Sequence, residues 1–347
     1  MPATPATTAS SNRLSALLSR VGLDWFFFGL IGVVVLAYLA PGIGSAGSPV
    51  PWRRITSLGV AVIFFLYGLR LSPEKLKAGM RNWRLHAVVQ FTTFGAFPLL
   101  ALAARPWFGS EAGQTLWASV FYLCTLPSTV STSVVMVSIA GGNLPGAIFN
   151  ASISSLLGIV LTPLWVSAVL HTGDAGGTNL GSMATDLALQ VLLPVVLGVL
   201  LHGRFGSWAE RHKQGLRLFD QSIILLMVYT SFCESFAENV FRDIRTTDLL
   251  LLALGMVALF VVVYAIIIGV SKLLGFSAED QVTALFCGSK KSLVHGTVMA
   301  KVLFASTAAT GVLLLPTMLY HALQILLASV IAQAIGRRMA ARLQSAT

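Results

Sequence analysis

Long apolar stretches alternate with short polar segments along nearly the whole chain. The apolar stretches carry almost no charge and many reach 18 residues or more, which is typical of helices that span a lipid bilayer. The pattern therefore predicts an all-α polytopic membrane protein with ten transmembrane helices. The predicted spans are 25–40, 55–71, 84–104, 115–140, 146–170, 184–202, 219–236, 248–275, 279–304 and 310–335.

Composition and charge exclude other classes of protein. Of the 347 residues, 56% are hydrophobic and 10% are charged, whereas soluble domains carry about a quarter charged residues. The net charge of +10 could indicate nucleic-acid binding, but the basic residues fall in short segments between apolar spans. Membrane topology explains that placement better, so no nucleic-acid partner is expected. The three cysteines lie inside apolar stretches and are expected to be buried packing residues.

The distribution of basic residues predicts the orientation. Fifteen of the 23 Lys and Arg residues fall on one side of the predicted topology, five fall on the other, and three lie inside a span. Because basic residues accumulate in the cytoplasm, both termini are expected there. Residues 1–24 are expected to form a disordered or amphipathic lead without a cleavable signal, and 336–347 a basic cytoplasmic tail. The Ala-rich, loop-poor chain indicates a bacterial inner membrane.

Polar residues interrupt two predicted spans at corresponding places. The fourth span contains Pro127, and the ninth contains Gly288 and Gly296. Proline and glycine both disfavour a continuous helix. These are the fourth spans of two five-span halves, 25–171 and 184–335, and an odd number of spans gives the second half opposite polarity. The sequence thus predicts an inverted 5+5 repeat whose discontinuous helices 4 and 9 form a transporter's binding site.

Two adjacent lysines, Lys290 and Lys291, stand near the middle of the ninth span. Inserting a charged side chain at that depth of the membrane costs roughly 3 kcal/mol or more. The two lysines are therefore expected to have a function. The two lysines could bind a substrate anion, pair with a carboxylate such as Glu234, or titrate. Glu234 could equally face water at the outer edge of its span. Asn150 and His321, each on the helix after a broken span, are either interhelical contacts or ligands.

The hydroxyl groups in the two breaks also have two interpretations. Ser and Thr side chains in membrane helices commonly bond back to their own helix, or they could line the site. Two segments resemble nucleotide-binding motifs of enzymes, but neither fits. Residues 42–47 match the glycine pattern of a dinucleotide-binding loop but are followed by a Pro-rich loop, and residues 288–292 lack the core sequence of a P-loop. No histidine spacing fits a metal site and no catalytic triad is visible. We therefore expect neither an enzyme nor a bound metal or cofactor.

Several strings, taken as a set, point to a known family. They are 65–71, Gln90 with Phe91, 127–129, 142–143, 150–152, 288–292 and 320–324. With the spans and the repeat, they resemble the bile acid:sodium symporter superfamily over about residues 25 to 335, and in particular the divergent branch that includes its seventh human member and bacterial relatives.

The resemblance implies a panel domain of spans 1, 2, 6 and 7 and a core domain of the other six, with substrate bound in the cleft between them. It also implies sodium sites near the crossing of spans 4 and 9. Gln90 and Ser133 fit the family's sodium ligands. Val134, Phe286 and Lys290 stand where the family has Asn, Glu and Gln. Our hypothesis is that Lys290, alone or with Lys291, replaces a bound sodium ion.

The expected function is secondary active transport of a small or amphipathic organic anion by alternating access, with sodium or protons as candidate coupling ions. The alternative is a membrane regulatory or scaffold protein that keeps the fold without transport. Expected partners are the anion and the lipid bilayer, and the oligomeric state is open. Predicted substrate ligands are Lys290, Lys291, Ser289, Ser128, Thr129, Asn150, His295 and His321. Predicted ion ligands are Gln90, Ser133, Thr132, Ser292 and Glu234.

Overall fold

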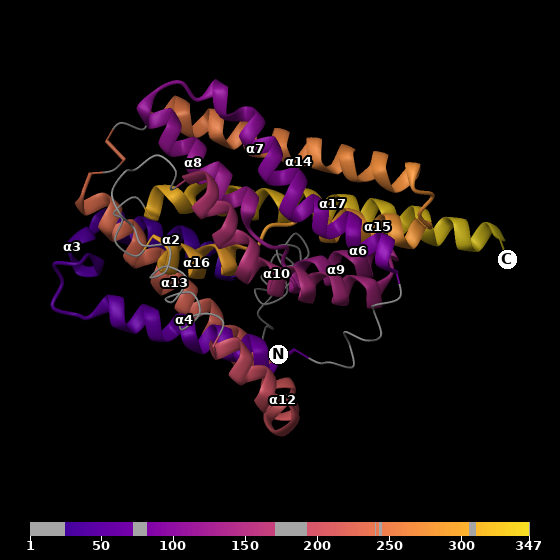
Figure 1. Ribbon diagram of the computed structural model, residues 1–347, viewed down its shortest axis with the longest axis horizontal. Coiled ribbons are helices and arrows are strands. Elements are labelled where there is room, and N and C mark those ends of the chain that lie inside the picture. Colours follow the sequence, from indigo (N-terminus) through magenta and orange to yellow (C-terminus); the bar gives the residue numbers. More distant parts are fainter. Residues whose placement is uncertain are drawn as a thin grey trace, which may run out of the picture.

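The computed structural model describes residues 25–71, 82–170, 193–239, 241–242, 245–304 and 310–346, and contains no strand within them (Figure 1). The expectations for 1–24 and for the start of the second repeat lie outside these residues. Within the described residues, six helices are long and apolar enough to cross a membrane, which confirms a polytopic membrane protein. They are Trp52–Leu69, Trp83–Trp107, Leu144–Leu170, Lys213–Ala237, Thr246–Leu273 and Thr310–Met339.

The described residues of the first half of the chain form a series of helices. They are α2 (Trp25–Leu39), α3 (Pro41–Gly44), α4 (Trp52–Leu69), α6 (Trp83–Phe91), a π-helical segment (Thr92–Ala96), α7 (Phe97–Ala104), a 3-10 turn (Arg105–Trp107), α8 (Glu111–Thr125), α9 (Ser131–Ala140) and α10 (Leu144–Leu170). The second half comprises α12 (Leu193–Arg211), α13 (Lys213–Ala237), α14 (Thr246–Leu273), α15 (Ala278–Gly288), α16 (Leu293–Leu303) and α17 (Thr310–Ala346).

Both interruptions predicted from the sequence are present. Helix α8 ends at Thr125, two residues before Pro127, and α9 begins at Ser131. Helix α15 ends at Gly288, as expected for a residue that disfavours helix. Gly296, by contrast, lies inside α16. A Cβ atom on Gly296 would come within 2.7 Å of the Leu126 side chain, so this glycine permits a close contact between the two broken spans instead of ending a helix.

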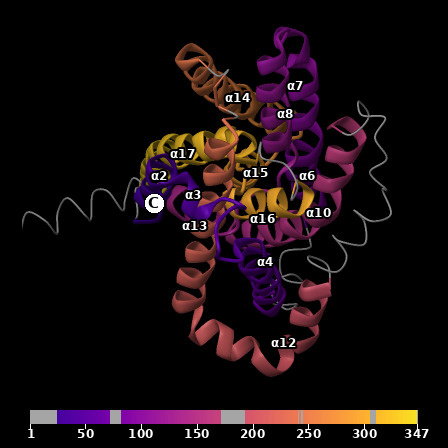
Figure 2. The same ribbon diagram turned by 90° about the vertical axis from the view of Figure 1, so that its left-hand side faces the viewer.

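The helices pack in two groups that are visible in both ribbon views. Helix α12 lies along α4, and α2 and α4 pack on α13, with α4 and α12 at the bottom of Figures 1 and 2. Helices α7, α8 and α14 lie at the top, and α17 contacts α8, α9, α13 and α14. The cysteines Cys124, Cys233 and Cys287 are free and buried, as expected.

An Asp–Asn cluster ties three helix N-termini together. The Asn82 side chain caps α6, and Asn143 Oδ1 accepts a hydrogen bond from the Gly146 backbone N–H (3.0 Å) in the first turn of α10. Asp280, in the first turn of α15, accepts from Asn82 Nδ2 at 2.6 Å and from Asn143 Nδ2 at 2.8 Å. Because a carboxylate near helix N-termini is favourable, this cluster fixes the ends of the helices that carry the centre of the protein.

We expect the contact between α4 and α12 to tolerate no side chain at its glycines. A Cβ atom on Gly198 would lie 2.2 Å from the Phe65 carbonyl oxygen, which is backbone and cannot rotate away. Gly198→Ala should therefore lower the thermal midpoint of the purified protein, since overpacking costs about 1–3 kcal/mol. Gly203→Ala, on the same helix with nothing within 4 Å, is the control and should leave the midpoint unchanged or raised. Equal midpoints for the two variants would contradict this packing.

Candidate substrate and ion site at the crossing of two broken helices

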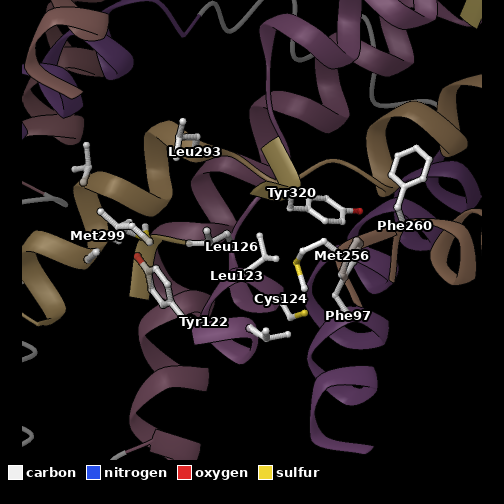
Figure 3. Close-up of a cluster of buried hydrophobic side chains, with 14 of the residues drawn as sticks. Phe97, Tyr122, Leu123, Cys124, Leu126, Met256, Phe260, Leu293, Met299 and Tyr320 are labelled. Carbon is white, nitrogen blue, oxygen red and sulfur yellow. The ribbon is translucent and has the colours of Figure 1, made fainter. Parts of the chain in front are cut away.

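The two breaks contact each other through their backbones. Ser292 N–H donates to the Pro127 carbonyl oxygen at 2.9 Å. In the other direction, Ser128 Oγ donates to the Cys287 carbonyl oxygen at 2.6 Å. Each break therefore supplies hydrogen-bond partners that the other has lost. Figure 3 shows the apolar side chains around this point, with Leu123 and Leu126 between Tyr122 and Tyr320.

The end of α8 has carbonyl groups without helical partners, as every helix C-terminus does. Side chains from distant elements satisfy them. Thr162 Oγ1 on α10 donates to the Thr125 carbonyl oxygen at 2.8 Å. The ammonium of Lys291 donates to the carbonyl oxygens of Cys124 at 2.7 Å and Leu126 at 2.8 Å. Side chains of the protein itself thereby pair a helix end that is buried in the interior.

Gln324 on α17 plays the corresponding part at the second break. Its side-chain amide accepts from Lys291 N–H and donates to the Lys291 carbonyl oxygen, both at 2.8 Å. Four residues earlier on the same face of α17, Tyr320 Oη donates to the Ser289 carbonyl oxygen at 2.8 Å. In the sequence, Gln324 appears only within the string 320–324 that supports the family resemblance, and nothing there indicated this role, because the pairing depends on how α17 packs.

The two lysines have different surroundings. Lys291 Nζ donates to three carbonyl oxygens, those of Thr93, Cys124 and Leu126, at 2.7–2.8 Å. Among the described residues, Lys290 Nζ has one acceptor within hydrogen-bonding distance, the Gln324 carbonyl oxygen at 3.1 Å. Both side chains are at most 1% exposed. An ammonium has three N–H donors, so Lys291 uses all of them whereas Lys290 keeps two.

Glu234 lies at a different place from the lysines. Its Oε2 atom accepts a hydrogen bond from the backbone N–H of Ala46 at 2.8 Å, in the connection that follows α3. Within the described part of the chain, no ion pair joins Glu234 to Lys290 or Lys291. Backbone carbonyls, not a carboxylate, therefore compensate the charge of Lys291.

A cluster of hydroxyl groups lies where α9 begins. Ser128 N–H donates to Ser154 Oγ on α10 at 2.9 Å. Ser133 Oγ lies 3.1 Å from Thr129 Oγ1 and 3.4 Å from Ser128 Oγ, and Thr129 is also bonded to Thr132. These contacts link the break to itself and to a neighbouring helix. Four predicted ligands are thus brought together: Ser128, Thr129, Thr132 and Ser133.

The predicted ligands Ser289, Gln90 and Asn150 also make hydrogen bonds within the protein. Ser289 Oγ bonds back to the Leu285 carbonyl oxygen at 2.6 Å, which is the ordinary behaviour of a helical serine. Gln90 Nε2 donates to the carbonyl and side-chain oxygens of Asn150 at 3.1 and 3.2 Å. Gln90 Oε1 is buried with no hydrogen-bond partner among the described residues, so it is free to accept from, or to coordinate, another group.

The predicted ligands His295 and His321 contact different parts of the protein. His295 Nδ1 lies 3.0 Å from Ser292 Oγ, and the imidazole ring makes edge contacts with Phe64 and Tyr67 of α4. His321 Nδ1 lies 3.1 Å from Gln324 Nε2. His295 thus faces the helix group that contains α4, and His321 faces the second break.

Removal of the Gln324 amide should destabilise the whole centre. Gln324→Leu leaves the Lys291 N–H and carbonyl groups buried without partners, at a cost of roughly 1–3 kcal/mol each. We expect a clear fall in the thermal midpoint of the purified protein. Gln333→Leu is the matched control, because Gln333 is exposed on the same helix, and its midpoint should stay near wild type. An unchanged midpoint for Gln324→Leu would mean that the Gln324 amide does not contribute to the stability of the protein.

Comparison with known proteins agrees with this architecture. Residues 24–337 match the SBF-like CPA transporter family. YfeH of Escherichia coli K12 is 37% identical over 317 residues, which cover 91% of this chain and 94% of that protein. Sodium/bile acid cotransporter 7-B of Xenopus laevis is 32% identical over 334 residues, covering 94% and 95%. Sodium/bile acid cotransporter 7 of Rattus norvegicus is 31% identical over 329 residues, covering 94% and 96%. The resemblance drawn from the motifs is confirmed, the relatives point to a transporter and not an enzyme, and the chain belongs to the SBF-like CPA transporter family.

Proposed function

We propose that this protein is a secondary active transporter of a small or amphipathic organic anion and that Lys290 is the cation that attracts the anion. The observation that carries the proposal is the Lys290 ammonium, which is buried where two broken helices cross and has two N–H donors left over. A buried charge at mid-membrane is costly and marks a functional site by default. A carboxylate, sulfonate or phosphate group would satisfy those donors with charge-assisted hydrogen bonds.

The other substrate ligands in the proposal come from the two breaks and from the helices that follow them. Ser128 and Thr129 belong to the first break and Ser289 to the second, while Asn150, His295 and His321 come from α10, α16 and α17. Lys291 stays in the predicted set, but its donors are already used. We therefore assign the leading role to Lys290.

Alternating access would open this site, which is closed in the conformation described. Ser128, Asn150 and Lys290 have no solvent exposure. The proposal divides ten spans into inverted repeats and into a panel and a core, and the packing of α2, α4, α12 and α13 on one another supports such a panel. The moving boundary would then pass between α4 and the core. Tyr67 on α4 donates to the Ser152 carbonyl oxygen across this boundary at 3.0 Å, so opening requires loss of that bond.

Transport in this proposal does not depend on sodium. The family resemblance puts Lys290 where a sodium ligand would be, and an ammonium 3–4 Å from a sodium ion would repel it by several kcal/mol in a poorly screened site. Gln90, Thr132, Ser133 and Ser292 remain candidates for a proton or ion path, and Glu234 lies away from the crossing. The proposed setting is a bacterial inner membrane with both termini in the cytoplasm.

A membrane scaffold that retains the fold without transport is the second candidate. It is favoured by the closed centre, in which most of the polar groups bond to one another and Lys291 has no free donor. The unused donors of Lys290 argue against it, because a scaffold gains nothing from a charge that its own groups leave unpaired.

Uptake into liposomes tests the proposal. The purified protein is reconstituted and exposed to labelled organic anions, including taurocholate, under separate sodium, proton and anion gradients. We expect uptake without a sodium gradient, and its loss in Lys290→Met, which removes the charge and keeps an unbranched side chain only one heavy atom shorter. Lys272→Met, at an exposed position near the end of α14, is the matched control and should retain uptake. Sodium-driven uptake that survives Lys290→Met would overturn the proposed role of this residue.

Thermal stability with added anions separates the transporter from the scaffold. A ligand that binds the folded state stabilises it by about 2.7 kcal/mol at one hundred times its Kd. We expect a saturable rise in the thermal midpoint with at least one anion of the panel, and no rise in Lys290→Met. Absence of any saturable rise, together with absence of uptake, would favour the scaffold.

A further inference from the structure

The Lys291 ammonium occupies a preformed nest of carbonyl oxygens. We define the carbonyl nest as the backbone oxygens of Thr93, Cys124 and Leu126, which lie 2.7, 2.7 and 2.8 Å from Lys291 Nζ. The ammonium also lies 4.1 Å from the centre of the Phe97 ring, in the geometry of a cation–π contact. We propose that the carbonyl nest is a binding site for a monovalent cation, which the chain fills permanently with its own tethered ammonium.

The first oxygen of the nest is free because of the π-helical segment. In an α-helix the Thr93 carbonyl would accept from Phe97 N–H, but that group donates to Thr92, five residues back. The next candidate, five residues beyond Thr93, is Pro98, which has no N–H group. The Thr93 carbonyl oxygen therefore lacks these helical N–H partners, and it accepts a hydrogen bond from the Lys291 ammonium instead.

The other two oxygens are free because α8 ends. The α-helical partner of the Cys124 carbonyl would be Ser128 N–H, which donates to Ser154 Oγ instead. Leu126 lies just beyond the last residue of α8, directly before Pro127. Carbonyl groups at a helix C-terminus carry partial negative charge that favours a cation. All three acceptors thus belong to backbone that the fold has released from helical bonding.

The geometry indicates the kind of cation. Three acceptors at hydrogen-bonding distance match the three N–H donors of an ammonium, whereas a neutral amine has two and would leave one acceptor without a donor. The distances of 2.7–2.8 Å are those of charge-assisted N–H···O bonds, and they exceed the roughly 2.3–2.6 Å of calcium–oxygen contacts. Rings of backbone carbonyls also replace the hydration shell of potassium in channels. The nest therefore suits primary ammonium groups, with potassium as the inorganic ion to compare.

Lys291 is a positioning residue in this proposal. Its backbone is bound to Gln324 at both the N–H and the carbonyl group, and its ammonium is bound to α8 and to the π-helical segment. The side chain therefore fixes the distance between the second break and the first. This role concerns stability and is independent of whether the protein transports anions.

Chemical rescue of Lys291→Ala tests the proposal. The substitution removes a group equivalent to propylammonium and leaves the carbonyl nest empty. The purified variant is heated in choline, sodium, potassium, ammonium and propylammonium chlorides at one ionic strength. We expect its thermal midpoint in choline to fall by on the order of 10 °C, and propylammonium to restore much of the loss with saturable concentration dependence. Wild type should not distinguish propylammonium from choline.

Three controls make the result specific. 1-Propanol has a similar shape and no charge, so it should not rescue Lys291→Ala. Lys290→Ala, which removes an ammonium bound to a single carbonyl, should show weaker rescue or none. Lys291→Met fills the space without charge and should stay destabilised in every salt. A wild-type midpoint for Lys291→Met, or equal rescue by propanol and propylammonium, would overturn the proposal.

Poor accumulation of Lys291→Ala would not prevent a decision. The readout then becomes the yield of monodisperse protein extracted in propylammonium compared with propanol and choline. A higher yield in propylammonium alone supports the carbonyl nest, and equal yields contradict it. Loss of anion uptake has no part in either readout, so failure of the transport proposal would leave this result unchanged.

Discussion

A lipid bilayer offers no hydrogen-bond partner to a peptide group, and this constraint determines the contacts at the centre of the protein. Two helices stop inside the membrane, at Thr125 and Gly288, and each stop releases backbone groups that must be paired internally. The breaks pair partly with each other, through Ser292 N–H on the Pro127 carbonyl oxygen. The rest is supplied by the Gln324 amide and by the ammonium of Lys291. Thr162 of α10 and Gln324 of α17 reach this point for the same reason, because each pairs a backbone group that a break has released.

The same constraint separates two lysines that are neighbours in sequence. Lys291 donates hydrogen bonds to three carbonyl oxygens and thereby stabilises the crossing of the two breaks. Lys290 reaches one, and it is the cation with capacity to bind something that the chain does not contain. Hydrogen bonds to three carbonyl oxygens compensate the buried charge of Lys291, and removing one partner from such a contact is strongly destabilising. A stable interior can therefore retain Lys291. Lys290 remains costly in this conformation, because a charge buried in the membrane with donors left unpaired is unfavourable.

In the alternating-access mechanism proposed above, movement would have to preserve the paired breaks while it exposes the site. The Asp280 cluster ties the ends of α6, α10 and α15 together, so these helices are expected to move as one body. Helix α4 contacts this region through one hydrogen bond from Tyr67 to the Ser152 carbonyl oxygen and through ring-edge contacts of Phe64 and Tyr67 with His295. In the mechanism proposed above, these are the contacts of α4 that opening would exchange.

The sequence by itself determined the class of protein, the two interruptions and the burial of two lysines at the second of them, because apolar length and proline chemistry act locally. It misjudged Gly296, which permits close packing inside α16 instead of ending a helix. It did not distinguish Lys290 from Lys291, and it gave Thr93 and Gln324 no role at the crossing. Those assignments required the tertiary structure, because they join residues 93, 124, 126, 291 and 324 through backbone oxygens whose freedom depends on where each helix stops. A backbone carbonyl has the same chemistry in every residue, so only packing decides which ones are left to bind a cation.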